Sequence, residues 1–145
     1  MPRDLKPYFY ELLIKPYFNA TESPEFYNGN VLVKFTCHKS TNKIVLHTHE
    51  NLELFNNTFE LSSQSDASLR TPLRGNLNWN FVVKTQFLII DLSRNNVLLS
   101  ENHNYSLSIG FKGLLKDDNA GFYKSSYLDD HGKKRLEFFF RFRSN

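Results

Sequence analysis

Five histidines are the side chains of this sequence with the clearest capacity for metal chemistry: His38, His47, His49, His103 and His131. None belongs to a His-Glu-x-x-His pair, the spacing that places two zinc ligands on one helical turn. His47 and His49 have strand spacing, so they could share one side with a third ligand such as His103. Two histidines this close are common by chance, and we therefore interpret them as exposed strand residues and predict no metal site.

The only cysteine is the one candidate thiol nucleophile of the chain. Cys37 lies two residues beyond Phe35 and four beyond Val33, so all three share one face of a strand. This register predicts a buried structural thiol and not a reactive one. A single cysteine also excludes an intramolecular disulfide.

Two pairs of adjacent carboxylates could carry acid and base chemistry: Asp117 with Asp118, and Asp129 with Asp130. Each pair lies close to Gly or Asn in turn-like sequence, which is typical of solvated turn carboxylates. The sequence has no Gly-x-Ser-x-Gly elbow, no Gly-x-Gly-x-x-Gly and no Walker-type Gly-Lys-Ser or Gly-Lys-Thr. We therefore expect no catalytic residue and no cofactor-binding residue in this chain.

Positive charge is concentrated in HGKKRLEFFFRFR, near the carboxyl terminus. Such a basic and aromatic segment could bind nucleic acid or an anionic membrane. Its alternation instead favours a core strand, with the side chains of Leu136, Phe138, Phe140 and Phe142 directed inward. The net charge of the whole chain is only +3, so we predict no nucleic-acid partner.

Compartment is left open by the sequence. The longest apolar run, around Phe87 to Ile90, is far shorter than the roughly 20 residues that span a bilayer, and MPRDLKPYFYE lacks the apolar segment of a secretory signal. As written, the chain would stay in the cytoplasm, with no direct membrane insertion. Asn19, Asn56 and Asn104 occupy Asn-x-Ser/Thr sequons, which would be glycosylated only if the chain entered the secretory pathway.

Strand signals dominate the organisation of the chain. Aromatic residues make up 15 % of the 145 residues, and no helical spacing of apolar residues extends over 11 residues. Gly29 is expected at a turn or bulge, and the polar segment 62–75 is expected as a loop or, equally, as a variable hairpin connection. Period-two patterns indicate an edge strand at 8–15 and further strands within 31–37, 43–47, 52–61, 78–92 and 104–115. We predict an all-β, antiparallel β-sandwich of about seven or eight strands, forming a single domain over 1–145.

Three stretches, in order, resemble the amino-terminal domain of the zinc aminopeptidase N family, the gluzincin aminopeptidases. They are PRDLKPYFYELLIKP, FYNGNVLVKFTCHKSTNKIVLHTHENLEL and SLSIGFKGLLKDDNAGFYKSSY. The last contains the family's Tyr-x-Leu-x-Ile-x-Phe-x-Gly pattern, if Tyr105 is included, and its Gly-Phe-Tyr-x-Ser-x-Tyr signature. The resemblance implies a β-sandwich that packs on a thermolysin-like catalytic domain and carries no zinc ligand itself.

The departures from the family pattern determine the expected function. Relatives continue into Thr-Gln-x-x-x-x-x-Ala-Arg, Gly-x-Met-Glu-Asn and His-Glu-x-x-His, whereas this chain reads RLEFFFRFRSN. We expect a non-catalytic amino-terminal domain (a fragment, isoform or truncated homologue) of an enzyme that in full-length form uses zinc to remove amino-terminal residues from peptides. Its expected partner is the catalytic domain of a full-length aminopeptidase. The alternative is a stand-alone interaction module that regulates a full-length relative. Many relatives are extracellular or membrane-anchored, so the resemblance does not choose a compartment.

Overall fold

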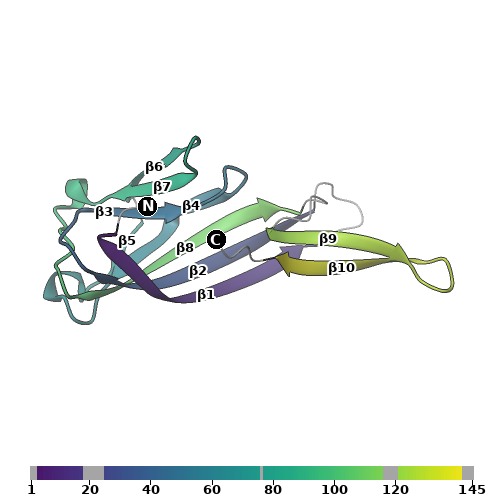
Figure 1. Cartoon of the computed structure of the whole chain (residues 1–145), viewed down its shortest axis with the longest axis horizontal. Coiled ribbons are helices and arrows are strands. Elements are labelled where there is room, and N and C mark those ends of the chain that lie inside the picture. The colour runs from purple at the N-terminus through teal and green to yellow at the C-terminus, as the bar shows by residue number, and fades with distance from the viewer. Residues whose placement is uncertain (1–2, 18–24, 76, 116–120, 142–145) are drawn as a thin grey trace.

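The chain forms two antiparallel sheets and a separate two-stranded hairpin (Figure 1). The computed structural model describes residues 3–17, 25–75, 77–115 and 121–141, with the side chains at 121–124, 134 and 136–141 outside the described set. Among the described residues, no helix is long and apolar enough to cross a membrane. The strands are β1 (Leu5–Tyr17), β2 (Phe26–Cys37), β3 (Lys43–His47), β4 (Glu53–Ser62), β5 (Leu73–Arg74), β6 (Asn78–Val82), β7 (Phe87–Asp91), β8 (Asn104–Leu114), β9 (Gly121–Leu128) and β10 (Lys134–Arg141).

The larger sheet has the strand order β1-β2-β8-β4-β5, so β1 is an edge strand, as predicted. Pro7 and Pro16 lie within β1, where an edge position tolerates residues that cannot donate a main-chain hydrogen bond. The period-two pattern of β2 is also confirmed, because Val33, Phe35 and Cys37 are all buried. The apolar face of this sheet therefore follows directly from the alternation in the sequence.

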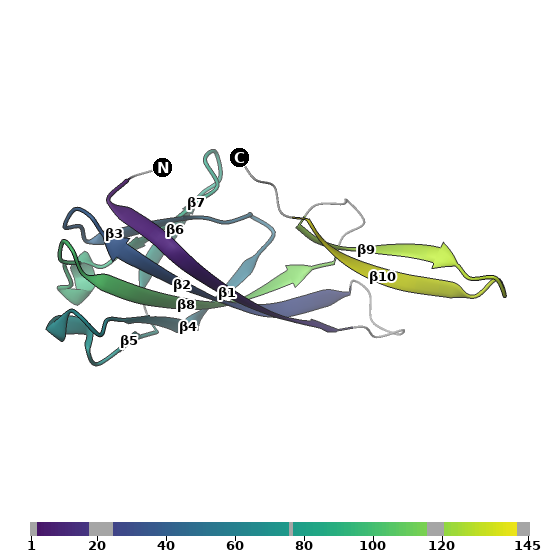
Figure 2. The same ribbon diagram turned by 60° about the horizontal axis from the view of Figure 1, so that its bottom comes forward.

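The smaller sheet has the order β3-β7-β6 and lies over part of the larger one, which completes the sandwich (Figures 1 and 2). Its β6 and β7 come from one continuous strand signal that the chain divides by a turn at residues 83–86. Gln86 adopts a left-handed φ of 54° in this turn. The all-β antiparallel sandwich predicted from the sequence is confirmed.

The core lies between the two sheets and is formed by side chains that alternate along the strands. Phe35 stacks on Tyr105 with ring centroids 5.7 Å apart, and Phe59 stacks on Trp79 at 6.2 Å. These aromatic pairs join strands of the larger sheet to each other and to β6. The most buried aliphatic side chains of this core are Ile44, Leu61, Leu69, Leu88, Ile90, Leu92, Leu99 and Leu107.

Gly29 does not occupy the predicted turn or bulge, because it lies inside β2 opposite Phe111. A Cβ atom at residue 29 would be 2.4 Å from Cζ of the Phe111 ring. The absence of a side chain thus lets the aromatic ring lie across the strand backbone. This close approach depends on a long-range pairing that the local sequence does not reveal.

The segment 62–75 is more structured than the loop that its composition predicts. It contains a short 3₁₀ helix, η1 (Ala67–Leu69), and the strand β5, which pairs with β4. Leu69 is buried in the core with only 2 % of its surface exposed. One apolar side chain therefore anchors a segment whose overall composition is polar.

The carboxyl-terminal segment forms a strand, as predicted, but not within the sandwich. Within the described chain, β10 pairs with β9 in a sheet of two strands. Both views show this hairpin projecting from one end of the sandwich (Figures 1 and 2). The inward alternation predicted for Leu136, Phe138, Phe140 and Phe142 lies outside the described side chains.

Candidate interaction surfaces

A buried carboxylate and phenol form the most perturbed pair of ionisable groups in the described chain. The Tyr105 hydroxyl donates to Oδ2 of Asp66 at 2.5 Å and accepts a hydrogen bond from the Ser100 main-chain N–H at 2.7 Å. Asp66 caps η1, since its Oδ1 accepts from the Ser68 main-chain N–H at 2.9 Å. The pair thereby joins the 62–75 segment to the start of β8.

The surroundings of this pair shift both ionisation equilibria. Burial alone would raise the pKa of Asp66, but hydrogen bonds from Tyr105 and Ser68 outweigh it and lower that pKa to about 2. Burial, together with the hydrogen bond to Asp66, raises the pKa of Tyr105 to about 12. The pair is fully formed at neutral pH, with an ionised carboxylate and a neutral phenol, and it is structural.

The pairing of Asp66 with Tyr105 could not be predicted from the sequence. Its one local signal is the Asp-x-Ser spacing at Asp66 and Ser68, which is typical of a capped turn. The partner Tyr105 lies 39 residues further along the chain. Such a long-range contact has no signature in a single sequence.

The histidines occupy separate environments. The His47 ring packs edge-on against Phe87 with centroids 4.6 Å apart, and Nδ1 of His49 accepts from the Asn51 main-chain N–H at 3.2 Å. His103 contacts the Glu101 carbonyl oxygen through Nδ1 at 3.0 Å. Across the described part of the chain, no three His, Cys, Asp or Glu side chains come together as a metal site would require.

Cys37 is a buried thiol, as its strand register predicts. Its exposed fraction is 0 %, and its Sγ donates to the Lys39 carbonyl oxygen at 3.1 Å. Burial raises the pKa of the thiol above its ordinary value. Since the thiolate is the reactive form, this environment disfavours nucleophilic chemistry at Cys37.

The carboxylate of Asp129 organises the turn between β9 and β10. Its Oδ1 accepts from the main-chain N–H groups of His131 and Lys133 at 3.0 and 2.8 Å, and its Oδ2 pairs with Nε of Arg135 at 2.8 Å. The hydrogen bonds from Lys133 and Arg135 lower the pKa of Asp129. The predicted turn role of Asp129 is confirmed, while Asp117 and Asp118 lie outside the described residues.

The predicted glycosylation sequons have different positions in the structure. Asn56 is exposed on β4, where its Oδ1 accepts from Nε1 of Trp79 at 3.1 Å. Asn104 is exposed at the start of β8 and accepts from the Thr36 hydroxyl at 2.7 Å. Asn19 lies outside the described residues, and glycosylation at all three positions stays a prediction.

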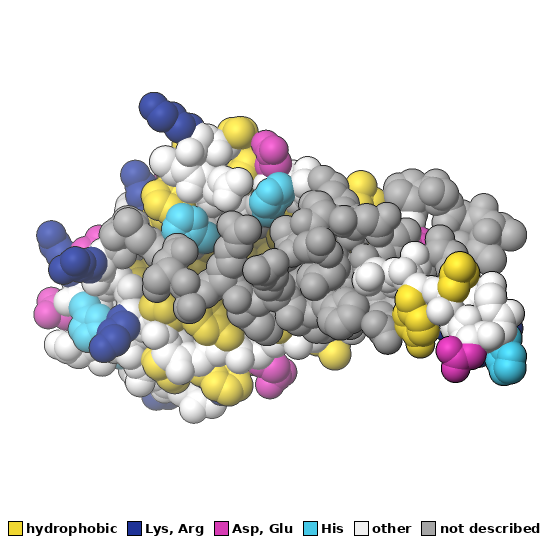
Figure 3. All heavy atoms as spheres, turned by 45° about the vertical axis from the view of Figure 1, so that its right-hand side comes forward, with side chains coloured by type: hydrophobic (Ala, Val, Ile, Leu, Met, Phe, Trp, Pro, Cys, Tyr) yellow, Lys and Arg dark blue, Asp and Glu magenta, His cyan; other side chains and the backbone are white. Residues whose placement is uncertain are grey.

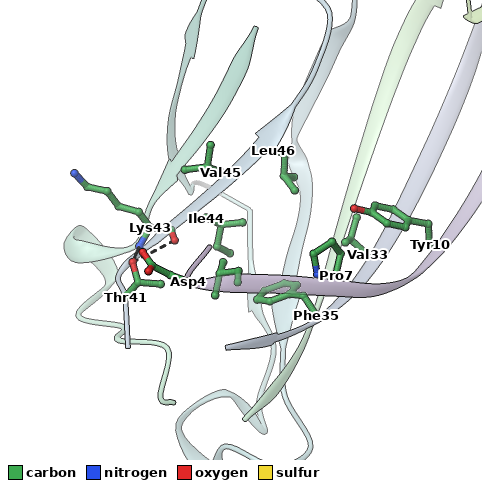
Figure 4. Close-up of a pocket in the computed structure, with 11 residues that line it drawn as sticks. Asp4, Pro7, Tyr10, Val33, Phe35, Thr41, Lys43, Ile44, Val45 and Leu46 are labelled. Atoms are coloured by element: carbon green, nitrogen blue, oxygen red, sulfur yellow. Dashed lines mark hydrogen bonds between the residues drawn. The ribbon is translucent and has the colours of Figure 1, made fainter. Parts of the chain in front are cut away.

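An apolar cavity of about 160 Å³ opens between the two sheets, where the edge strands β1 and β3 face each other. Figure 4 shows Tyr10 and Pro7 on the β1 side and Ile44 and Leu46 on the β3 side. Val33 contributes from β2. This opening is a consequence of the sandwich geometry, because two edge strands do not close the seam with hydrogen bonds.

The β9–β10 hairpin also exposes apolar side chains, on both of its faces, because consecutive residues of a strand alternate in direction. Tyr127 and Leu128, at the end of β9, have exposed fractions of 50 % and 69 %. Figure 3 shows apolar side chains on the exposed end of the hairpin. Exposed apolar side chains on a projecting element are typical of a region that meets another protein or domain.

These features define a class: an all-β sandwich domain whose perturbed groups are structural and which exposes apolar side chains at its open seam and on its hairpin. The family model for the Peptidase M1 N-terminal domain matches residues 6–142. The chain therefore belongs to the Peptidase M1 family and corresponds to its amino-terminal domain.

Curated relatives agree with this assignment. The chain is 30 % identical over 137 residues to Aminopeptidase N of Rattus norvegicus and 31 % identical over 144 residues to Aminopeptidase N of Canis lupus familiaris. These alignments cover 92 % and 94 % of the chain but 14 % of each relative. The human thyrotropin-releasing hormone-degrading ectoenzyme is 29 % identical, over 91 % of the chain and 11 % of its own length. The chain thus spans about one seventh or less of these relatives.

Proposed function

We propose that this chain is a non-catalytic amino-terminal domain of a zinc aminopeptidase, which in full-length form removes amino-terminal residues from peptides. The observation that carries the proposal is the match of the amino-terminal family model to residues 6–142. The named aminopeptidases align with nearly the whole chain through a small part of their own length. Because the chain shares this domain with aminopeptidases, we infer that it belongs to an enzyme of the same kind. The residues that perform peptide hydrolysis lie in another part of that enzyme.

The described side chains do not fit the zinc that this family implies. A catalytic zinc site needs three protein ligands around one ion, and the described residues offer no such group. The buried Asp66 and Tyr105 are fully engaged with each other and with Ser68 and Ser100. We therefore derive no step of peptide hydrolysis from this chain and assign zinc to the catalytic domain of the full-length enzyme.

The role that we propose for this domain is to pack on that catalytic domain through its β9–β10 hairpin. Tyr127 and Leu128 supply exposed apolar side chains on the two faces of the hairpin, and Asp129 holds the adjoining turn through its bonds to Lys133 and Arg135. A rigid turn lowers the conformational entropy lost when the hairpin docks. The partner of this surface is thus a second domain of the same enzyme.

Binding in trans tests the role of the hairpin. The 145-residue chain would be mixed with the separately expressed catalytic domain encoded by the same gene, and the dissociation constant measured by calorimetry. We expect the double variant Tyr127→Ser/Leu128→Ser to weaken binding by roughly tenfold or more, as is typical when apolar anchors are removed from an interface. The matched control is Val83→Ser/Leu98→Ser, since Val83 and Leu98 are 63 % and 58 % exposed in other parts of the fold.

The outcomes show whether the exposed side chains of the hairpin bind the catalytic domain. Weaker binding by the hairpin variant, with unchanged binding by the control, supports docking through the hairpin. Equal affinities for both variants would contradict it. Peptide hydrolysis by the purified chain, dependent on added zinc, would overturn the assignment of this chain as non-catalytic.

A further inference from the structure

The edge strand β1 exposes an unusual amount of apolar surface. Of the ten large hydrophobic side chains that are exposed in the described chain, five lie on this strand: Tyr8, Phe9, Tyr10, Leu12 and Leu13. β1 is 13 residues long, and in the described structure only its β2 side is paired. Long apolar edge strands are templates for pairing with another strand.

The hydrogen bonds of the neighbouring strand β2 determine which main-chain N–H and C=O groups of β1 face its free edge. At the two ends of β2, Cys37 bonds toward the β8 side through the His103 carbonyl oxygen, and Glu25 does so through the Leu115 N–H. Odd-numbered residues of β2 therefore direct their main-chain groups toward β8. Because bonding direction alternates along an antiparallel strand, their partners on β1 direct N–H and C=O groups away from β2.

Beyond the register shift between Pro7 and Phe9, the β1 partners of these odd-numbered residues are Tyr10, Leu12, Ile14 and Pro16. The position of Pro16 agrees with this geometry, since a residue without an N–H is tolerated where no ladder donor is needed. Tyr10, Leu12 and Ile14 thus direct their main-chain groups toward the free edge. These residues make a continuous pairing edge in the middle of β1.

The charges of β1 select the register in which a second β1 would fit. Phe9, Glu11, Leu13 and Lys15 lie on the outer face of the sheet, the face on which the Lys34 ammonium contacts the Phe9 ring at 4.9 Å. In an antiparallel pair centred on Leu13, Glu11 of each copy faces Lys15 of the other. Centring on Glu11 would instead oppose two carboxylates, and centring on Leu12 would leave both charges facing apolar residues.

We propose that β1 is a homotypic docking edge, on which a second copy of this chain pairs antiparallel about a twofold axis at Leu13. Leu12 of one copy and Ile14 of the other exchange both main-chain hydrogen bonds, and Glu11 pairs with Lys15 across the axis. The two five-stranded sheets then become one continuous sheet. The interface is isologous, since the same strand is used by both copies.

Cysteine cross-linking tests the register. Leu13 is 69 % exposed, and cysteines at the twofold axis of an antiparallel pair lie opposite each other at a separation that suits a disulfide. We expect Leu13→Cys to give a covalent dimer rapidly under mild oxidation of the 145-residue chain. Phe9→Cys is the matched control, because exposed residue 9 faces residue 17 in this register and not itself, and the Glu11–Lys15 pair is kept. The unsubstituted chain controls for Cys37, which is fully buried.

A charge exchange tests the same contact without a covalent bond. Glu11→Lys or Lys15→Glu alone places like charges opposite each other twice in the dimer, and we expect each to raise the dimer dissociation constant roughly tenfold in sedimentation equilibrium. The double variant Glu11→Lys/Lys15→Glu restores opposite charges and should restore the constant. Lys84→Glu, on the β6–β7 turn, is the control substitution.

Each outcome bears on the proposal. Preferential cross-linking at residue 13 and rescue by the double exchange support it. A chain that is monomeric at all concentrations, or equal cross-linking at residues 9 and 13, would overturn it. Polydisperse association that ignores the charge exchange would also overturn it and would assign the β1 surface to non-specific contact or to another domain. None of these results depends on the catalytic partner proposed above.

Discussion

Asp66 and Tyr105 show how one hydrogen-bonded pair makes stability depend on pH. The pKa of Asp66 is lowered from 3.8 to about 2 in the folded chain. The unfolded chain therefore binds the proton first as pH falls, which favours unfolding. The stabilisation is present above about pH 4 and is lost as pH falls toward 2.

We expect the Asp66→Asn variant to be less stable than the parent chain at pH 6 by on the order of 2 kcal/mol, because about 2 pKa units correspond to this free energy. The difference should narrow as pH is lowered from 5 to 2. Urea unfolding, followed by the fluorescence of Trp79, measures both curves. A difference that does not change with pH would show that the Asp66 carboxylate does not contribute through its ionisation.

A second prediction for a single residue concerns the packing of Gly29 against Phe111. A methyl group at residue 29 would collide with the Phe111 ring, and overpacking of this kind costs about 1–3 kcal/mol. Gly29→Ala should lower the free energy of unfolding by that amount. The cost should shrink in a Phe111→Leu background, and equal costs in both backgrounds would refute the proposed contact.

At the scale of elements, the strands follow the sequence where their two faces differ in polarity. The alternation in β2 and β8 predicts their buried faces because one face packs on the core. The division of 78–92 into β6 and β7 was not predicted, since the intervening turn depends on a left-handed Gln86 and not on glycine or proline. Leu69 and Gly29 likewise take their roles from contacts distant in sequence.

For the β9–β10 hairpin, we predict that its local stability depends on Asp129. Asp129→Ala removes the acceptor of the His131 and Lys133 N–H groups and the partner of Arg135. We expect faster amide hydrogen exchange in β9 and β10, with unchanged exchange in β2 and β8, because the hairpin forms a separate sheet. Asp130→Ala is the matched control. Equal exchange in both variants would contradict the role of Asp129 as the residue that organises this turn.

At the scale of the whole molecule, family membership was predictable because its motifs are local and ordered along the chain. The edge position of β1 was also predictable from its flanking prolines, whereas the projection of the β9–β10 hairpin from the sandwich was not, since it depends on which strands pair over long range. The chain corresponds to the amino-terminal domain of the Peptidase M1 family, and its described residues include a structural carboxylate–phenol pair. We therefore propose that catalysis belongs to residues outside this domain.

Sequencing the transcript beyond codon 145 tests this assignment most directly. We predict that a mature message continues in frame into Gly-x-Met-Glu-Asn and His-Glu-x-x-His. In the aminopeptidase N family these motifs bind the amino group of the peptide and the zinc ion, respectively. A catalytic domain encoded downstream would make this chain the amino-terminal part of an aminopeptidase. Messages that all stop after Asn145 would contradict the proposed function.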